Sequence, residues 1–509
     1  MISISRQRLE SGLVLTLGGR LVFFHPELSR LAIFHNDPDQ TGVPDPETLR
    51  RWFHEAFGKP GAAQPGAAQP GASQTNEFAV REYWKQARHA VSALNLNLTD
   101  KCNLACIYCY ARGGNYQRLH QELSPEAAVN GVAAAFAQAD PQRDFRIEFF
   151  GGEPFLNPAA IQAVLDWQSG DLTWINHPHG TRNRVSTNLT ELSESLLQDI
   201  RRSKMILSVS IDGSGTIQDE QRPFKDGSGS SRIIFDHLRQ VREACPDHTI
   251  VARMTVYHHA DKLRHTLEEL VATDLFDYAS IYPAAVHSDK TRDVGDSYFS
   301  RDFQQEFLAI AADYPRFVGR GRFKGILELN RYCQLLLEGR AAANHCRAGS
   351  GYFTLSPDGS IHPCHRLVGD LSWNLGTFAL GTPEHLARLR PWHTTIFERP
   401  ACAACALRYL CGGGCKQENL LASGSLIGTS PRVCAFSHLL FDAAVSVCAN
   451  LTPVIIPPLR QAFRESEGLF VLCGQPLVHS PRPPVPSETP GRKNSDRPRC
   501  IFPEGMFLS

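Results

Sequence analysis

The chain has 509 residues, which is too long for one compact core and predicts two or three domains. Basic and acidic residues number 52 each, so the balance of charge predicts no nucleic-acid-binding surface. No secretion signal or membrane-length apolar run is recognisable, and we therefore expect a cytoplasmic protein without a membrane partner. In that compartment the 15 cysteines are better explained as metal ligands than as disulfides.

Residues 1–58 are expected to form a small N-terminal α+β module. Residues 13–17 and 20–24 flank two glycines and predict a β-hairpin, and residues 45–57 predict a capped helix. Such a module could recognise a peptide by adding a strand to its sheet edge, although a purely structural cap is an equally good interpretation. Residues 59–75 repeat Pro-Gly-Ala-Ala-Gln and predict a flexible linker.

Strands alternate with helices between residues 76 and 295. The strand candidates are residues 94–98, 146–150, 184–187, 205–211, 249–256 and 278–282, and Ser124 with Pro125 marks the clearest helix start. Six successive β/α units imply parallel strands with right-handed crossovers. The predicted fold is therefore α/β, a partial (β/α)6 TIM barrel with its active site at the carboxyl ends of the strands.

A cysteine loop directly follows the first of these strands. Cys102, Cys106 and Cys109 have the spacing Cx3Cx2C, so three thiolates can hold three irons of a [4Fe-4S] cluster and leave the fourth iron open. A structural zinc site would need a fourth ligand, and none lies beside this loop. A redox motif would need only Cx2C.

The loop resembles the cluster loop of the radical SAM superfamily, in which the open iron chelates S-adenosylmethionine (SAM). Reductive cleavage of SAM in that superfamily yields a 5′-deoxyadenosyl radical. The segment Gly151-Gly-Glu-Pro154, at the end of the second strand, resembles the superfamily's turn that holds the amine of SAM. The resemblance implies SAM contacts from Tyr108, Gly151, Gly152, Glu153, Pro154, Thr187, Asn188, Ser208, Ser210, Asp212, Arg222 and Arg253.

A second set of cysteines follows a predicted helical bridge at residues 296–340. Within residues 341–450, a Gly-x4-Cys segment ending at Cys364 follows Cys346, and then comes Cx2Cx5Cx3C from Cys402 to Cys415 and finally Cys434. Taken alone, residues 402–415 could form a zinc ribbon. The whole set resembles the seven-cysteine SPASM domain of radical SAM peptide modifiers, which holds two auxiliary [4Fe-4S] clusters.

The SPASM resemblance also implies a division of these ligands. Cys402, Cys405, Cys411 and Cys434 would hold the distal cluster, and Cys346, Cys364 and Cys415 would hold the nearer one. For the missing fourth ligand of the nearer cluster we consider Cys333, or an open iron that coordinates a substrate thiol. Cys245, Cys448, Cys473 and Cys500 fit no pattern, and the extension at residues 451–509 is predicted to be largely disordered from about residue 480.

Three functions fit these patterns. The sequence is similar to thioether-forming maturases of Cys-rich peptides and to the cross-linking maturase of quinohemoprotein amine dehydrogenase. This implies a Cys-containing precursor peptide or small protein subunit as substrate and flavodoxin or ferredoxin as a low-potential electron donor. An anaerobic sulfatase maturase, which makes formylglycine, is the alternative, but that group has Asp directly after its second SPASM cysteine where this chain has His365. The third interpretation is a non-catalytic iron–sulfur scaffold.

Overall fold

The structure is a computed structural model, and it describes a defined part of the chain. The described residues are 4–9, 12–17, 20–25, 30–35, 47, 81, 91–115, 119–284, 299–338, 340–342, 344–377, 383–451, 456–466, 469 and 477–479. The predicted linker and the segment from residue 480 onward lie outside them.

The N-terminal strands form an antiparallel sheet in the order β1-β2-β3-β4. Their bounds are β1 (Ile4–Leu9), β2 (Gly12–Leu17), β3 (Arg20–His25) and β4 (Arg30–His35). The predicted hairpin is confirmed, because β2 pairs with β3 and Leu17 lies opposite Arg20. Strands β1 and β4 were not predicted, and apart from Glu47 the predicted helix lies outside the described residues.

A second sheet has eight strands in the order β10-β9-β8-β7-β6-β5-β12-β13. The first six in chain order are β5 (Ala93–Asn97), β6 (Phe145–Phe150), β7 (Thr181–Thr187), β8 (Ile206–Ser210), β9 (Ile250–Val256) and β10 (Tyr278–Pro283). Neighbouring strands among these six are all parallel. The predicted strands, their order and their direction are therefore confirmed.

The same sheet continues into the C-terminal half of the chain. Strand β12 (Tyr352–Leu355) pairs in parallel with β5, and β13 (Ile361–His362) pairs antiparallel with β12. A further small sheet joins β11 (Arg340–Ala342) to β14 (Leu477–His479). The C-terminal cysteine segment is thus joined to the first barrel strand by backbone hydrogen bonds, which the sequence analysis did not predict.

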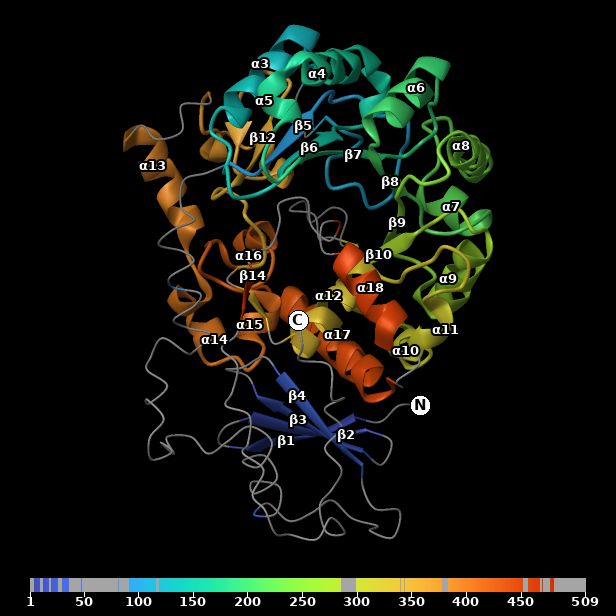
Figure 1. Ribbon diagram of the computed structural model, residues 1–509, viewed down its shortest axis with the longest axis vertical. Coiled ribbons are helices and arrows are strands. Elements are labelled where there is room, and N and C mark those ends of the chain that lie inside the picture. Colours follow the sequence, from blue (N-terminus) through green and yellow to red (C-terminus); the bar gives the residue numbers. More distant parts are fainter. Residues whose placement is uncertain are drawn as a thin grey trace.

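Helices cover the outer side of the curved sheet (Figure 1). These are α3 (Pro125–Phe136), α4 (Pro158–Gly170), α5 (Leu172–Ile175), α6 (Glu194–Ser203), α7 (Thr216–Gln221), α8 (Ser231–Ala244) and α9 (Leu263–Ala272). The Ser124 side chain accepts a hydrogen bond from the backbone N–H of Ala127, so the predicted helix cap is confirmed. Short 3-10 turns complete this half at η3 (Pro154–Leu156) and η4 (Ala260–Lys262).

The remaining helices begin with the predicted bridge, which contains α10 (Arg301–Ala312), α11 (Tyr314–Phe317) and α12 (Leu327–Glu338). They continue with α13 (Pro383–Leu389), α14 (Pro400–Ala403), α15 (Arg408–Cys411), α16 (Lys416–Ser423), α17 (Pro431–Ala449) and α18 (Ile456–Ser466). Four 3-10 turns lie between them, at η7 (His365–Leu367), η8 (Leu371–Trp373), η9 (Arg390–His393) and η10 (Ile396–Glu398).

Helix α17 occupies the junction between these parts. It packs against α10 and α12, and its Phe441 ring lies 4.9 Å from the Phe24 ring of the N-terminal sheet. Among the described residues it is the one helix that is long and apolar enough to cross a membrane by length and composition alone. Most of its side chains are buried, as expected for a core helix.

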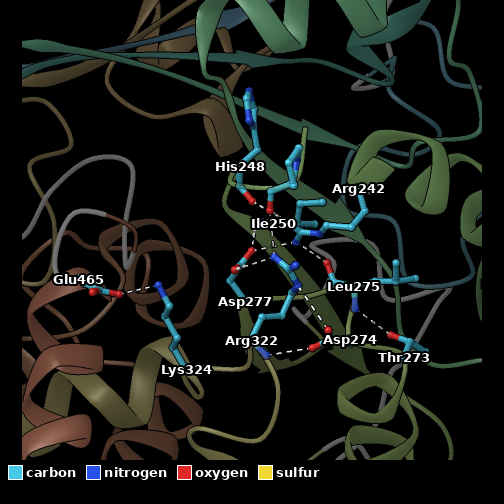
Figure 2. Close-up of polar contacts among 11 residues, drawn as sticks. Arg242, His248, Ile250, Thr273, Asp274, Leu275, Asp277, Arg322, Lys324 and Glu465 are labelled. Atoms are coloured by element: carbon cyan, nitrogen blue, oxygen red, sulfur yellow. Dashed lines mark hydrogen bonds and ion pairs between the residues drawn. The ribbon is translucent and has the colours of Figure 1, made fainter. Parts of the chain in front are cut away.

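A polar network ties together the amino ends of β9 and β10, opposite the predicted active site (Figure 2). The Asp277 carboxylate accepts hydrogen bonds from Arg242 at 3.0 Å and from the backbone N–H of Ile250 at 2.9 Å. Arg242 also donates to the backbone carbonyls of His248 and Leu275. In barrels of this type the amino end serves stability, and we assign this network that role.

Candidate active site

The cysteine loop leaves the carboxyl end of β5, and polar groups reach all three of its sulfurs. The Asn188 side-chain amide lies 3.8 Å from Cys102 Sγ, the Arg222 guanidinium 4.0 Å from Cys106 Sγ, and the Gly113 N–H 3.4 Å from Cys109 Sγ. Donors directed at sulfur are typical of thiolates that ligate a cluster.

Without metal, the loop favours neutral thiols. Burial raises the pKa of Cys102 to about 12, with a further contribution from the Glu153 carboxylate. Burial also raises the pKa of Cys106 to about 11, although the Arg222 charge opposes the shift. Binding of an iron cluster would therefore release protons from this loop, and the affinity for iron should fall at low pH.

The Gly-Gly-Glu-Pro turn packs directly against the cysteine loop. The Gly152 N–H donates to the Thr99 carbonyl at 2.7 Å, and the Glu153 N–H donates to the Lys101 carbonyl at 2.8 Å. A Cβ atom at position 152 would lie 2.2 Å from the Lys101 carbonyl oxygen, and only glycine avoids this clash. The two motifs that the sequence predicted as partners are thus joined backbone to backbone.

The Glu153 carboxylate is buried and accepts three hydrogen bonds. Its donors are the Thr187 hydroxyl at 2.6 Å, the Asn188 N–H at 2.7 Å and the Phe155 N–H at 3.1 Å. Burial raises the pKa of Glu153 to about 7, and these hydrogen bonds oppose the shift. Glu153, Thr187 and Asn188 therefore form one cluster, and Pro154 begins the following turn η3.

Asp212 and Arg222 form a buried ion pair beside Cys106. Two guanidinium nitrogens of Arg222 each lie 3.0 Å from an oxygen of the Asp212 carboxylate. The Tyr108 hydroxyl also donates to Asp212, and the Arg222 guanidinium lies 5.2 Å from the Tyr108 ring centre. Tyr108, Asp212 and Arg222, three of the residues predicted to contact SAM, therefore lie together. The charge of Arg222 is balanced by Asp212.

Ser208, Ser210 and Arg253 lie on the inner face of the sheet. Ser208 is fully buried and accepts a 2.7 Å hydrogen bond from Arg184, whereas Ser210 is half-buried and pairs in register with Arg253 on β9. The Arg253 side chain is exposed in the barrel interior and makes no hydrogen bond or ion pair within the described part of the chain. The Ser208 hydroxyl is thus already hydrogen-bonded to Arg184, whereas the guanidinium of Arg253 can still contact a ligand in the barrel.

The C-terminal cysteines come together in the two groups that the sequence predicted. Cys411 interacts electrostatically with Cys402, Cys405 and Cys434. Cys364 interacts with Cys415 and Cys346. Nowhere in the described ranges do three His, Cys, Asp or Glu side chains lie close enough together to hold a single metal ion.

Cys333, by contrast, does not join the nearer group. It is fully buried on α12, its Sγ lies 3.9 Å from the Ala444 carbonyl of α17, and its sulfur hydrogen bonds with Cys448. None of these contacts involves a predicted cluster ligand. The position of α12 in the core thus argues against Cys333 as the fourth ligand, and it gives Cys448 a thiol partner.

The buried charge around the C-terminal cysteines fits anionic groups at these positions. Arg399 is fully buried, and its Nε and one terminal nitrogen have no hydrogen-bond partner. Burial lowers the pKa of Arg399, and interactions with Cys402 and Cys411 act in the opposite direction. Because a buried cation normally needs a compensating charge, the residues fit thiolate-ligated clusters.

His365 faces the space between the barrel and the C-terminal segment. Its Nδ1 is 2.7 Å from the Tyr352 hydroxyl, and its ring centre lies 5.0 Å from that of Phe150 at the end of β6. Burial, together with the charges of Arg366 and Arg253, lowers the pKa of His365 to about 3. The side chain that follows Cys364 is therefore a neutral imidazole.

Two contacts of Arg366, which connects the two cysteine regions, could not be predicted from the sequence. Its guanidinium lies 5.2 Å from the ring centre of Tyr110, directly after Cys109, and 3.9 Å from Cys415 Sγ. It also donates to Glu418 at 2.8 Å. The only signal in the sequence was its position two residues after Cys364, which does not reveal where a long side chain points.

Comparisons with known proteins agree with this arrangement. Residues 96–270 match the Radical SAM superfamily. The chain is 30% identical over 138 residues to the uncharacterized protein MJ0907 of Methanocaldococcus jannaschii, a match that covers 27% of this chain but only 44% of that relative. It is 22% identical over 383 residues to the serine-type anaerobic sulfatase-maturating enzyme of Klebsiella aerogenes, covering 72% of this chain and 86% of the other.

A solved structure has the same fold. It is that of native anSMEcpe with bound AdoMet and Cp18Cys peptide, with a TM-score of 0.57 and 18% identity over 73% of this chain and 99% of the other.

Proposed function

We propose that this chain is a radical SAM enzyme that modifies a ribosomally made peptide or small protein subunit that contains cysteine. The arrangement of the cysteines carries the proposal: an open group of three at the barrel mouth, and groups of four and three in the C-terminal segment. The similarity to a sulfatase-maturating enzyme and the peptide named in the solved neighbour support a peptide or protein substrate.

SAM and a [4Fe-4S] cluster are implied by the superfamily. We propose that Cys102, Cys106 and Cys109 hold the cluster and that the Gly-Gly-Glu-Pro turn holds the SAM amine. When bound, the pair supplies a 5′-deoxyadenosyl radical. The ion-paired Arg222 beside Cys106 is suited to the SAM carboxylate, and Tyr108 to the wall of the nucleoside site.

The substrate residue is proposed to enter between Arg253 and His365. These side chains come from β9 and from the C-terminal segment, and the Arg253 charge acts on the His365 imidazole. Phe150 at the end of β6 lies beside His365 and provides an apolar wall. A peptide in this space would lie on the barrel side of the nearer cysteine group.

We propose thioether formation as the reaction. One hydrogen atom passes from a substrate carbon to the adenosyl radical, the cysteine thiol loses a proton, and the C–S bond forms as one electron leaves the product. Two auxiliary [4Fe-4S] clusters, held by the C-terminal cysteines, are proposed to receive that electron. A low-potential donor such as flavodoxin or ferredoxin would supply the electron that cleaves SAM.

Sulfatase maturation is the second candidate, and the similarity to the Klebsiella enzyme favours it. It would require a general base after the second SPASM cysteine. His365 occupies that position as a neutral imidazole that already interacts with the Tyr352 hydroxyl. This residue, in place of a carboxylate, is why we favour thioether formation.

The N-terminal sheet is proposed to dock the precursor peptide. One face of the sheet packs on the rest of the protein, because Leu15, Val22 and Phe24 are buried in the core. Among the described strands, β1 and β4 are the sheet edges, where a peptide could add a strand.

Chemical probes of the product separate the two reactions. Reconstituted protein is incubated with SAM, reductant and the Cys-containing peptide encoded beside its reading frame. Both reactions consume an alkylatable thiol when cysteine is the modified residue, but only formylglycine adds a hydrazide-reactive aldehyde. An aldehyde in a peptide without a cross-link would overturn the thioether proposal.

The dependence on the cysteine loop needs a matched control. Cys106→Ala should abolish formation of 5′-deoxyadenosine, because one of the three cysteine ligands of the cluster is lost. Cys245→Ala removes a thiol that lies outside all three cysteine groups and should leave that activity unchanged. Equal activity of the Cys106 variant and the unmodified enzyme would overturn the assignment of the loop.

A further inference from the structure

Arg399 is a buried guanidinium with unused hydrogen-bond donors. It directly precedes α14, and it is 0% exposed. One terminal nitrogen donates to the Gly413 carbonyl at 2.5 Å, while Nε and the other terminal nitrogen have no partner. Buried charges are normally paired, so these nitrogens require an anionic or strongly accepting group.

The surroundings of Arg399 identify the chemistry of that group. Its four strongest electrostatic partners are all cysteine sulfurs, two from each C-terminal group: Cys402 and Cys411 from one, Cys346 and Cys415 from the other. The guanidinium charge therefore acts on both groups rather than on one alone. A planar fork of five N–H donors can serve acceptors on two sides.

Gly413, the middle glycine between Cys411 and Cys415, makes room for this side chain. Gly413 adopts φ 82°, and its N–H donates to Cys411 Sγ at 3.2 Å while its carbonyl accepts from Arg399. A Cβ atom at position 413 would lie 2.6 Å from the guanidinium. Gly413 in the Cys-Gly-Gly-Gly-Cys sequence thus has a steric reason, which is the close approach of the Arg399 guanidinium.

We propose that Arg399 is a shared counter-ion of the two auxiliary clusters, donating to thiolate ligands of both and raising the reduction potential of each. The inference rests on the proposed function, which supplies the clusters. A cluster held by thiolates gains negative charge on reduction, so a nearby cation stabilises the reduced form. Both clusters would then accept an electron from the product radical more readily.

Arg366 differs from Arg399 in two respects that make it a useful comparison. It interacts with Cys415, at 3.9 Å, and with Cys364, both of which belong to the nearer group. Its charge is partly balanced by Glu418, which also pairs with Arg432. Arg366→Gln should therefore shift the potential of the nearer cluster alone.

The experiment is a potentiometric titration followed by electron paramagnetic resonance. The full-length chain carries Cys106→Ala, to remove the signal of the first cluster, and is reconstituted with iron and sulfide. In this background Arg399→Gln should lower both midpoint potentials, and Arg399→Lys should lower them less because it keeps the charge. Arg239→Gln is the control, because Arg239 is exposed on α8, pairs with Asp236 outside the C-terminal segment and should leave both potentials unchanged.

Iron content separates failure of this inference from failure of the proposed function. If the chain without substitutions bound only about four irons, both the auxiliary clusters and the role of Arg399 would be overturned. If both auxiliary clusters assembled and Arg399→Gln shifted neither potential, or only one, the shared role alone would be wrong. If the Arg399→Gln protein did not assemble the auxiliary clusters but the Arg399→Lys protein did, the role of the positive charge would be supported. If neither variant assembled them, that role would be overturned.

Discussion

The Glu153 carboxylate already accepts hydrogen bonds from the protein, so its orientation is set before any ligand binds. Its two oxygens accept from the Thr187 hydroxyl and from the backbone N–H groups of Asn188 and Phe155. The carboxylate therefore fixes the ends of β6 and β7 relative to each other. A ligand amine would meet a carboxylate that is already oriented.

Glu153→Gln should destabilise the turn although it preserves size. Either orientation of the amide places its NH2 group against a donor, and an unsatisfied buried donor costs about 1–3 kcal/mol. We expect the free energy of unfolding to fall by about that amount and SAM to bind more weakly. Chemical denaturation and equilibrium binding of SAM measure the two effects; an unchanged SAM affinity would contradict the role of the turn.

The stability of the cluster-free protein should fall below neutral pH because of His365. Its pKa is lowered to about 3 in the folded chain and is near 6.5 in the unfolded chain, so between these values only the unfolded chain binds the proton. This contribution is fully present above about pH 6.5 and is lost as pH falls, by up to about 1.4 kcal/mol per pH unit.

His365→Asn should therefore flatten the dependence of stability on pH between about 6 and 4. Urea denaturation of the metal-free protein at several pH values measures the slope. His265→Asn, at an exposed position on α9, serves as the matched control and should keep the original slope. Equal slopes for the His365 variant and the unmodified chain would show that this histidine is not held neutral.

At the scale of elements, the amino ends of the barrel strands stabilise the fold, whereas the carboxyl ends carry the candidate active site. Asp277, directly before β10, holds Arg242 and the amino end of β9 (Figure 2), whereas the cysteine loop follows the carboxyl end of β5. Asp277→Ala leaves the half-buried Arg242 charge without its carboxylate and should cost roughly 3 kcal/mol of stability. SAM cleavage below the unfolding temperature should be unchanged.

Glu465→Gln is the control for that substitution. It removes the exposed Lys324–Glu465 ion pair in the same view, at 2.6 Å, which should contribute no more than about 1 kcal/mol. Thermal unfolding compares the two variants. A loss of SAM cleavage by Asp277→Ala at a temperature where it is folded would contradict the separation of tasks.

The contact between the Gly-Gly-Glu-Pro turn and the cysteine loop depends on Gly152. A methyl group there would meet backbone atoms of Lys101, which cannot move aside as a flexible side chain could. Gly152→Ala should therefore displace the turn from the loop and reduce SAM cleavage at least about tenfold, equivalent to roughly 1.4 kcal/mol. Gly170→Ala, where a Cβ atom meets nothing within 4 Å, should have no such effect.

The sequence predicted the elements whose patterns are local. Six strands and the Ser124 cap could be read from alternation and capping residues, because each depends on a few adjacent positions. Strand β12 was not predicted, because its partner β5 is about 260 residues away in the chain and no local pattern encodes that pairing. Cys333 was predicted to ligate a cluster from spacing alone, whereas α12 turns it toward Cys448 in the core.

At the scale of the whole molecule, strand pairing and one core helix connect the barrel, the C-terminal segment and the N-terminal sheet. The C-terminal segment extends the barrel sheet through β12, and α17 joins that segment to the N-terminal sheet through Phe441 and Phe24. Cysteine spacing predicted which thiols gather, but not the cations among them. Arg366 and Arg399 belong to no motif, since long side chains reach positions that spacing does not define.

The transfer of hydrogen from the peptide to SAM tests the central claim most directly. The precursor peptide is labelled with deuterium at the side-chain carbons of the residues that flank its cysteines and is incubated with reconstituted enzyme, SAM and reductant. We predict that 5′-deoxyadenosine gains one deuterium for each cross-link, while the peptide loses that deuterium and the hydrogen of one thiol. Unlabelled 5′-deoxyadenosine together with a peptide of unchanged mass would contradict the account.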